Sequence, residues 1–120
     1  MPNSEADKQQ IIRKLLVVKQ DAHSLEISLR FKGRNKQADE LAAKAQKLSE
    51  KIDTLLGQVM VEWAVEADEI ASDIGQANAS LQSSIQEIQN GIDIAQNIVK
   101  ALGYVDDVVA IAAKIAATVK

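Results

Sequence analysis

Apolar residues recur every three or four positions over the last two-thirds of this 120-residue chain. The row comprises Leu41, Ala45, Leu48, Ile52, Leu55, Val59, Trp63, Ala67, Ile70, Ile74, Ala77, Leu81, Ile85, Ile88, Ile92, Ala95, Val99 and Leu102. Alternating spacings of four and three keep one stripe of an α-helix facing a partner helix. The row therefore predicts an all-α fold, built as a helical bundle or hairpin.

The composition agrees with one helical domain that spans residues 1–120. Apolar residues make up 47 % of the chain and are nearly all aliphatic, since Phe31, Trp63 and Tyr104 are the only aromatic residues. Pro2 is the only proline, so no proline stops a helix inside the chain. The chain has no cysteine, which excludes disulfides and thiolate metal sites.

The first ten residues are polar and lack the apolar core of a signal peptide. The sequence also has no run of about 18 apolar residues, so we expect no transmembrane helix. A soluble cytoplasmic protein is the default expectation, and secretion without a signal stays open.

Charge is divided unevenly along the chain. Residues 1–51 hold 11 Lys/Arg and 7 Asp/Glu, a balance of +4, whereas residues 52–120 hold 3 and 10, a balance of −7. Together these give the net charge of −3. The pattern predicts that a basic first helix lies against an acidic later one, within one chain or between chains. Such surface pairs stabilise a protein by only about 0–1 kcal/mol each, but they can select the partner and the register.

We expect an antiparallel bundle with coiled-coil-like packing, made of three long helices and a short C-terminal helix. Their expected bounds are about 4–32, 36–72, 78–102 and 107–119. Gly33 and Gly103 each follow an apolar stripe and mark helix ends. Residues 72–80 are dense in cap and turn residues and mark the remaining turn. The apolar row continues through this stretch, so an unbroken helix stays open as an alternative, and Asn90-Gly91 is a second candidate break.

The expected first helix has two apolar faces. Its main stripe begins at Ile11 and Leu15, and a second face carries Ile12, Leu16, His23 and Ile27. A two-sided helix either sits between two neighbours or contacts another molecule. We expect these four residues to form a partner-binding surface. If His23 lies buried in such a contact, assembly becomes pH-dependent.

Four cations gather at the expected first turn, namely Arg30, Lys32, Arg34 and Lys36. They are candidate anion contacts for a nucleic-acid backbone, an acidic partner or a lipid headgroup. A solvated helix tip is the favoured interpretation. Nucleic acid is not favoured as a partner, because the chain is acidic overall and has no aromatic platform on which bases could stack.

Four carboxylates, Glu62, Glu66, Glu69 and Asp73, follow spacings that place them on one face of a continuous helix. Such a stripe could hold Mg²⁺ or Mn²⁺. It resembles the helical acidic clusters of all-α nucleotide pyrophosphohydrolases, which implies metal-dependent nucleotide hydrolysis. The spacing differs from that family, and no second acidic motif follows on a later helix. We therefore disfavour this function and expect neither a metal nor a cofactor.

The favoured function is a non-enzymatic helical module for protein–protein interaction or self-assembly, whose partner is a protein, including a second copy of the chain. The alternative from another class is a membrane-active, pore-forming-like bundle, which makes a membrane a second, less favoured partner. The argument against catalysis is that the chain has no cysteine, one histidine, no phosphate-binding glycine loop and no serine-nucleophile motif.

Overall fold

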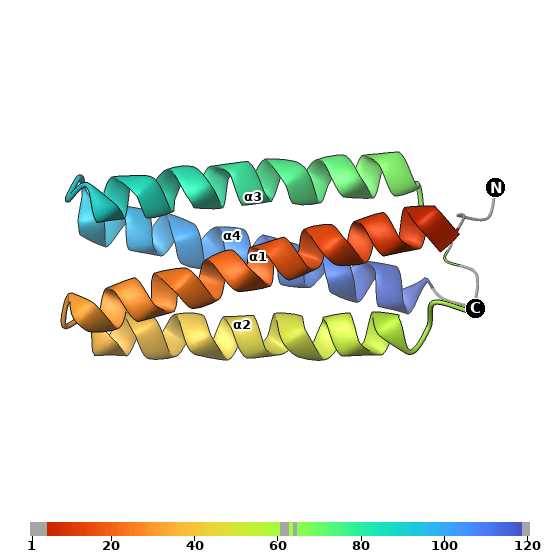
Figure 1. Cartoon of the computed structure of the whole chain (residues 1–120), viewed down its shortest axis with the longest axis horizontal. Helices are drawn as coiled ribbons and strands as arrows, with labels where there is room; N and C mark the ends of the chain where they lie inside the picture. Colours follow the sequence, from red (N-terminus) through yellow and green to blue (C-terminus); the bar gives the residue numbers. More distant parts are fainter. Residues whose placement is uncertain (1–4, 61–62, 64, 119–120) are drawn as a thin grey trace.

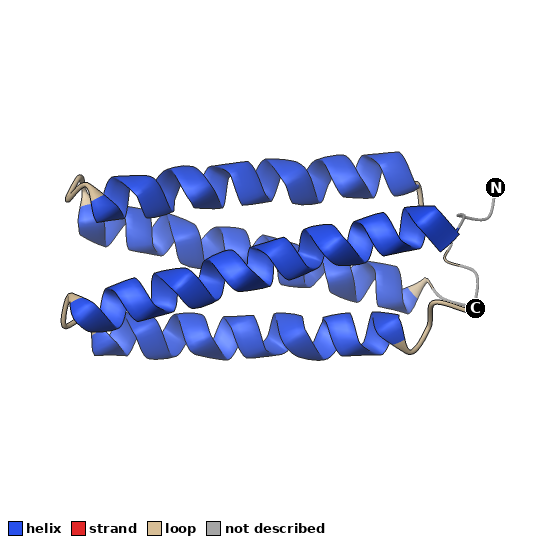
Figure 2. Cartoon of the chain, viewed as in Figure 1, coloured by secondary structure: helices blue, strands red, loops and turns tan. Residues whose placement is uncertain are grey.

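The computed structural model describes residues 5–60, 63 and 65–118, which form an all-α bundle of four helices (Figure 1). They are α1 (Glu5–Phe31), α2 (Asn35–Leu56), α3 (Ala67–Gln89) and α4 (Ile94–Ala117). Figure 2 shows the helices lying side by side along a rod that measures 46 × 21 × 17 Å. The predicted all-α helical bundle is confirmed.

The bundle consists of two helical hairpins, α1–α2 and α3–α4, that lie against each other (Figure 1). Consecutive helices run antiparallel, as expected. Between the hairpins, α1 packs on α3 and α2 packs on α4, and both of these pairs run parallel (Figure 1). Among the described residues, α2 and α3 do not touch and occupy opposite corners of the bundle. The connection between Leu56 and Ala67 therefore joins opposite corners at one end of the bundle, and we call its described residues (57–60, 63, 65 and 66) the crossover segment.

The first helix forms as the sequence predicts. Its buried stripe comprises Ile11, Leu15, Val18, Ala22, Leu25 and Leu29. Gly33 follows the helix with a φ of +76°, a conformation that suits glycine. The Arg34 N–H donates to the Leu29 carbonyl at 2.9 Å, and the Gly33 N–H donates to the Arg30 carbonyl at 3.1 Å. These bonds form a Schellman motif, which satisfies the last carbonyl groups of α1.

The predicted helix 36–72 is wrong at its end, because α2 stops at Leu56. The apolar row misled here, since Val59 and Trp63 keep the helical spacing but lie in the crossover segment. Trp63 is fully buried and Val59 packs against the core. A loop side chain that fills the end of a bundle therefore looks, in sequence, like the next position of a helical stripe.

The predicted turn at residues 72–80 is also wrong, because this stretch lies inside α3. The flanking core residues Ile74 and Leu81 are fully buried on the same stripe. Gly75 costs a helix about 1 kcal/mol relative to alanine, a penalty that burial of a single large aliphatic side chain offsets. Core packing thus overrides the local turn propensity of this segment.

The last two expected helices, 78–102 and 107–119, are separated at Gly103, and this boundary is wrong. The turn falls at Gly91, the second candidate break, where φ is +77° and the Ile92 N–H donates to the Glu87 carbonyl at 2.8 Å. Gly103 lies inside α4, which is therefore a long helix. The core stripe of α4 runs through this position and comprises Ile98, Ala101, Val105, Val108, Ala112 and Ile115. The apolar row had assigned Val99 to the core, but this side chain is 69 % exposed.

Alanine substitutions at the two glycines should have opposite effects. Gly103→Ala should raise the free energy of unfolding by about 1 kcal/mol, because a Cβ at this helical position meets no other atom within 4 Å. Gly91→Ala should lower it by about 1–2 kcal/mol, because its left-handed backbone disfavours a side chain. Urea denaturation followed by circular dichroism measures both changes. If Gly103→Ala instead lowered the free energy of unfolding and Gly91→Ala raised it, the helix would end at Gly103.

A salt bridge joins the basic and acidic halves of the chain. Lys44 Nζ on α2 lies 2.7 Å from Asp106 Oδ2 on α4. On the other side of the bundle, the Gln82 amide donates to Asp21 Oδ2 at 3.2 Å and links α3 to α1. The Lys44–Asp106 pair joins an early helix to a late one, but its lysine lies on α2 rather than on the expected first helix, and the Gln82–Asp21 contact involves only one charged group.

Candidate protein-binding surface

The second face of α1 is partly covered and partly exposed. Leu16 is 42 % exposed, Ile27 is 45 % exposed and His23 between them is also exposed. Ile12, the fourth residue expected on this surface, is only 6 % exposed in the single chain. It is buried because Leu56 and the crossover segment lie beside it.

Phe31 extends the exposed face at the carboxyl end of α1. Its side chain is 88 % exposed, which is unusual for a large apolar residue. Leu16, Gln20, His23 and Ile27 follow spacings of four, three and four, and Phe31 lies one turn further along the same side of the helix. We call these five residues the outer face of α1. Sequence analysis did not assign Phe31 to this face.

A cavity of about 430 Å³ opens at the opposite, amino-terminal end of α1. Its apolar wall consists of Ile12, Leu56 and Val59. The remaining lining residues are Glu5, Lys8, Gln9 and Arg13. Because the apolar residues come from α1, from the last residue of α2 and from the crossover segment, this cavity exists only when the chain leaves α2 at Leu56. It continues the outer face of α1 toward the amino end of the helix.

Lys8 and Trp63 hold the crossover segment in place behind this cavity. Lys8 is buried, and its Nζ donates to the Val59 carbonyl at 2.9 Å. The same Nζ lies 5.9 Å from the centroid of the Trp63 ring, within the range of a cation–π interaction. The Trp63 indole N–H donates to the Gln58 carbonyl at 3.0 Å. The acceptor of this bond is a backbone carbonyl within the crossover segment itself.

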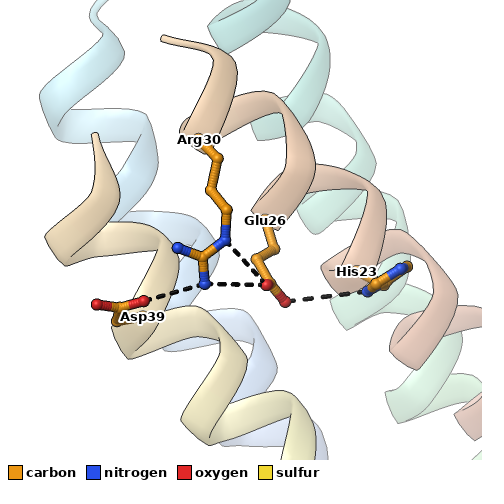
Figure 3. A network of polar contacts seen from close by, with 4 residues as sticks. All are labelled: His23, Glu26, Arg30 and Asp39. Carbon is orange, nitrogen blue, oxygen red and sulfur yellow. Dashed lines mark hydrogen bonds and ion pairs between the residues drawn. The ribbon is translucent and has the colours of Figure 1, made fainter. Parts of the chain in front are cut away.

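One of the four cations at the turn between α1 and α2, Arg30, is already paired with carboxylates. The Arg30 guanidinium donates to Glu26 Oε2 through Nε at 3.2 Å and to Asp39 Oδ1 through Nη2 at 3.0 Å (Figure 3). The Asp39 and Glu26 carboxylates raise the pKa of Arg30. Of the other three anion-contact candidates, Lys32 and Lys36 are exposed and Arg34 is half-buried. Arg30 therefore bridges α1 and α2, whereas the other cations surround the turn.

His23 lies on the other side of Glu26 from Arg30 (Figure 3). Its Nδ1 is 3.9 Å from Glu26 Oε1, and its side chain is solvent-exposed in the single chain. His23 therefore does not belong to the core of the bundle. It is available to another molecule on the outer face of α1.

The expected acidic stripe does not form on one helix. α3 begins at Ala67, so Glu66 precedes the helix, while Glu69 and Asp73 lie exposed on α3. Glu62 lies outside the described residues. Within the described part of the chain, no three His, Cys, Asp or Glu side chains come close enough to hold a metal ion. The geometry on which the pyrophosphohydrolase alternative depended is therefore absent from these residues.

The fold and this surface define a four-helix bundle in which the outer face of α1 is partly apolar and uncovered. Over the described residues, no helix combines the length and apolar character needed to cross a membrane. Compared with protein-family models, curated proteins and solved structures, the chain matches none of them.

Proposed function

We propose that this chain is a non-enzymatic interaction module that binds another protein through the outer face of α1. The observation that carries the proposal is the exposure of Leu16, Ile27 and Phe31 along one side of one helix. Single exposed apolar residues are ordinary, but a row of them marks a contact surface. The row also leads into an apolar cavity at the amino end of the same helix.

The chemistry of this face suits a helical partner. Apolar side chains at spacings of four and three present a stripe that a second helix can pack against. Exposed Gln20 and His23 at its centre add hydrogen-bonding groups that select a register. The single histidine lies 3.9 Å from the Glu26 carboxylate, a partner that is not a nucleophile. The surface therefore supports binding better than it supports catalysis.

Photo-crosslinking tests this proposal. Benzoylphenylalanine at Gln20, on the outer face, should form covalent adducts in cells that express the chain. The matched position is Gln96, which is exposed on α4. A second change, Leu16→Gln with Ile27→Gln, should remove the Gln20 adducts, while Ile92→Gln with Val99→Gln on the other hairpin should keep them.

Two results would contradict the proposal. One is equal capture at Gln20 and Gln96, and the other is capture at Gln20 that persists when both Leu16 and Ile27 are polar. All four apolar positions are exposed, so the substitutions should leave the fold intact. Circular dichroism checks this for each variant.

A further inference from the structure

The two ends of the outer face of α1 are complementary to each other. Phe31 protrudes at the carboxyl end, and the cavity lined by Ile12, Leu56 and Val59 opens at the amino end. We propose that a second copy of the chain occupies this face in an antiparallel arrangement, so that Phe31 of each copy enters the cavity of the other. This inference rests on the proposed function, because it names the partner of the same surface.

A two-fold axis fixes the register of this contact. Ile12 and Phe31 are separated by about 28 Å along α1 at 1.5 Å per residue. An axis that crosses α1 midway between them, at the Asp21–Ala22 bond, exchanges the protruding ring with the cavity. The same axis places Leu16 opposite Ile27 of the partner subunit. Such a two-fold contact gives a closed dimer: every interaction occurs twice, and neither copy keeps this surface free to bind a third chain.

The polar residues of the outer face fit the same register. Gln20 and His23 lie at equal distances on either side of the axis, so each faces the other residue type in the partner. Both side chains are exposed, and each can donate and accept hydrogen bonds. The centre of the contact is therefore polar, and its two flanks are apolar.

Charge favours the antiparallel arrangement over a parallel one. Glu5 is exposed in the first turn of α1, whereas Lys32, Arg34 and Lys36 surround the opposite end. An antiparallel pair brings the acidic turn of each copy toward the basic turn of the other, and a parallel pair stacks the basic turns on each other. Arg13 then faces the partner's Arg30, whose charge Glu26 and Asp39 offset.

Disulfide trapping tests the arrangement, because the chain has no cysteine of its own. Leu16→Cys and Ile27→Cys chains are prepared separately, and one is labelled with ¹⁵N. Mixed under a glutathione redox buffer, they should form a disulfide between unlike chains. Each variant alone should not, since like positions lie about 16 Å apart along the antiparallel helices and a disulfide needs Cα atoms within about 7 Å. Disulfides between like chains only would show a parallel pair and overturn the arrangement.

Light scattering from low to high micromolar protein tests the role of Phe31. The wild-type mass should rise from that of a monomer to that of a dimer, and Phe31→Ala should raise the dimer dissociation constant at least tenfold. Val99→Ala, at an exposed apolar position on α4, should leave it unchanged. A monomer at every concentration, or a dimer that tolerates Phe31→Ala, would overturn the inference. The proposed function is tested separately by photo-crosslinking, so a monomeric chain that still forms adducts specific to Gln20 would overturn only the dimer.

Discussion

Replacing Trp63 with alanine should lower the free energy of unfolding by about 3–5 kcal/mol, the usual cost of removing a large buried aromatic side chain. Trp63 is fully buried and belongs to the crossover segment, between the end of α2 and the start of α3. Truncation removes its packing, its hydrogen bond to Gln58 and its contact with Lys8 together. For a chain of this length, the melting temperature should fall by more than 10 °C.

Circular dichroism at 222 nm measures this effect, because Trp63 is the only tryptophan and its fluorescence is lost in the variant. Phe31→Ala is the matched control, since it also removes an aromatic ring but from an exposed position. The control should change the stability of the monomer by less than about 0.5 kcal/mol. Equal losses in the two variants would contradict the placement of Trp63 in the core.

The second large effect is expected for Lys8→Met. Methionine keeps much of the apolar stem but removes the ammonium group, so the Val59 carbonyl loses its donor and the Trp63 ring loses its cation. A partly buried polar group left without its partner costs about 1–3 kcal/mol. We expect a loss of stability in this range, measured by urea denaturation.

Trp63 fluorescence gives a local readout of the same variant. If Lys8 holds the crossover segment, the Trp63 emission of the Lys8→Met variant should move toward longer wavelengths before global unfolding. Lys14→Met, on the same helix, is the control and should not move it. Lys8→Met and Trp63→Ala should also be non-additive, because the two residues are in contact. Additive losses would show that Lys8 acts independently of Trp63.

The sequence predicted α1 closely because several independent signals agree there. Acidic residues in the first turn, one buried stripe and a glycine after the last turn all point to the same bounds. Later in the chain the signals conflict. Gly57, Gly75, Gly91 and Gly103 all interrupt apolar rows, and nothing local shows which of them end a helix. The choice depends on packing between hairpins, which a single sequence does not display.

The sequence predicts the part of the candidate surface that depends on α1 alone. Leu16, His23 and Ile27 lie away from the main stripe of α1, and helical geometry alone places them on a second face. The burial of Ile12 and the cavity beside it depend on Leu56 and Val59. The positions of these two residues follow from the end of α2 at Leu56, well before the predicted end at residue 72. Phe31 was missed because its exposure depends on which parts of α1 the other helices leave uncovered.

The position of α2 and α3 at opposite corners of the bundle also affects the order in which the chain folds. Each hairpin closes over a short turn, so its contacts are close in sequence, whereas docking of one hairpin on the other joins distant segments. Loop-closure entropy slows the formation of such distant contacts. We therefore expect the two hairpins to form first and to dock afterwards. Burial of Trp63 would complete the process, which makes its fluorescence a kinetic probe of the last folding step.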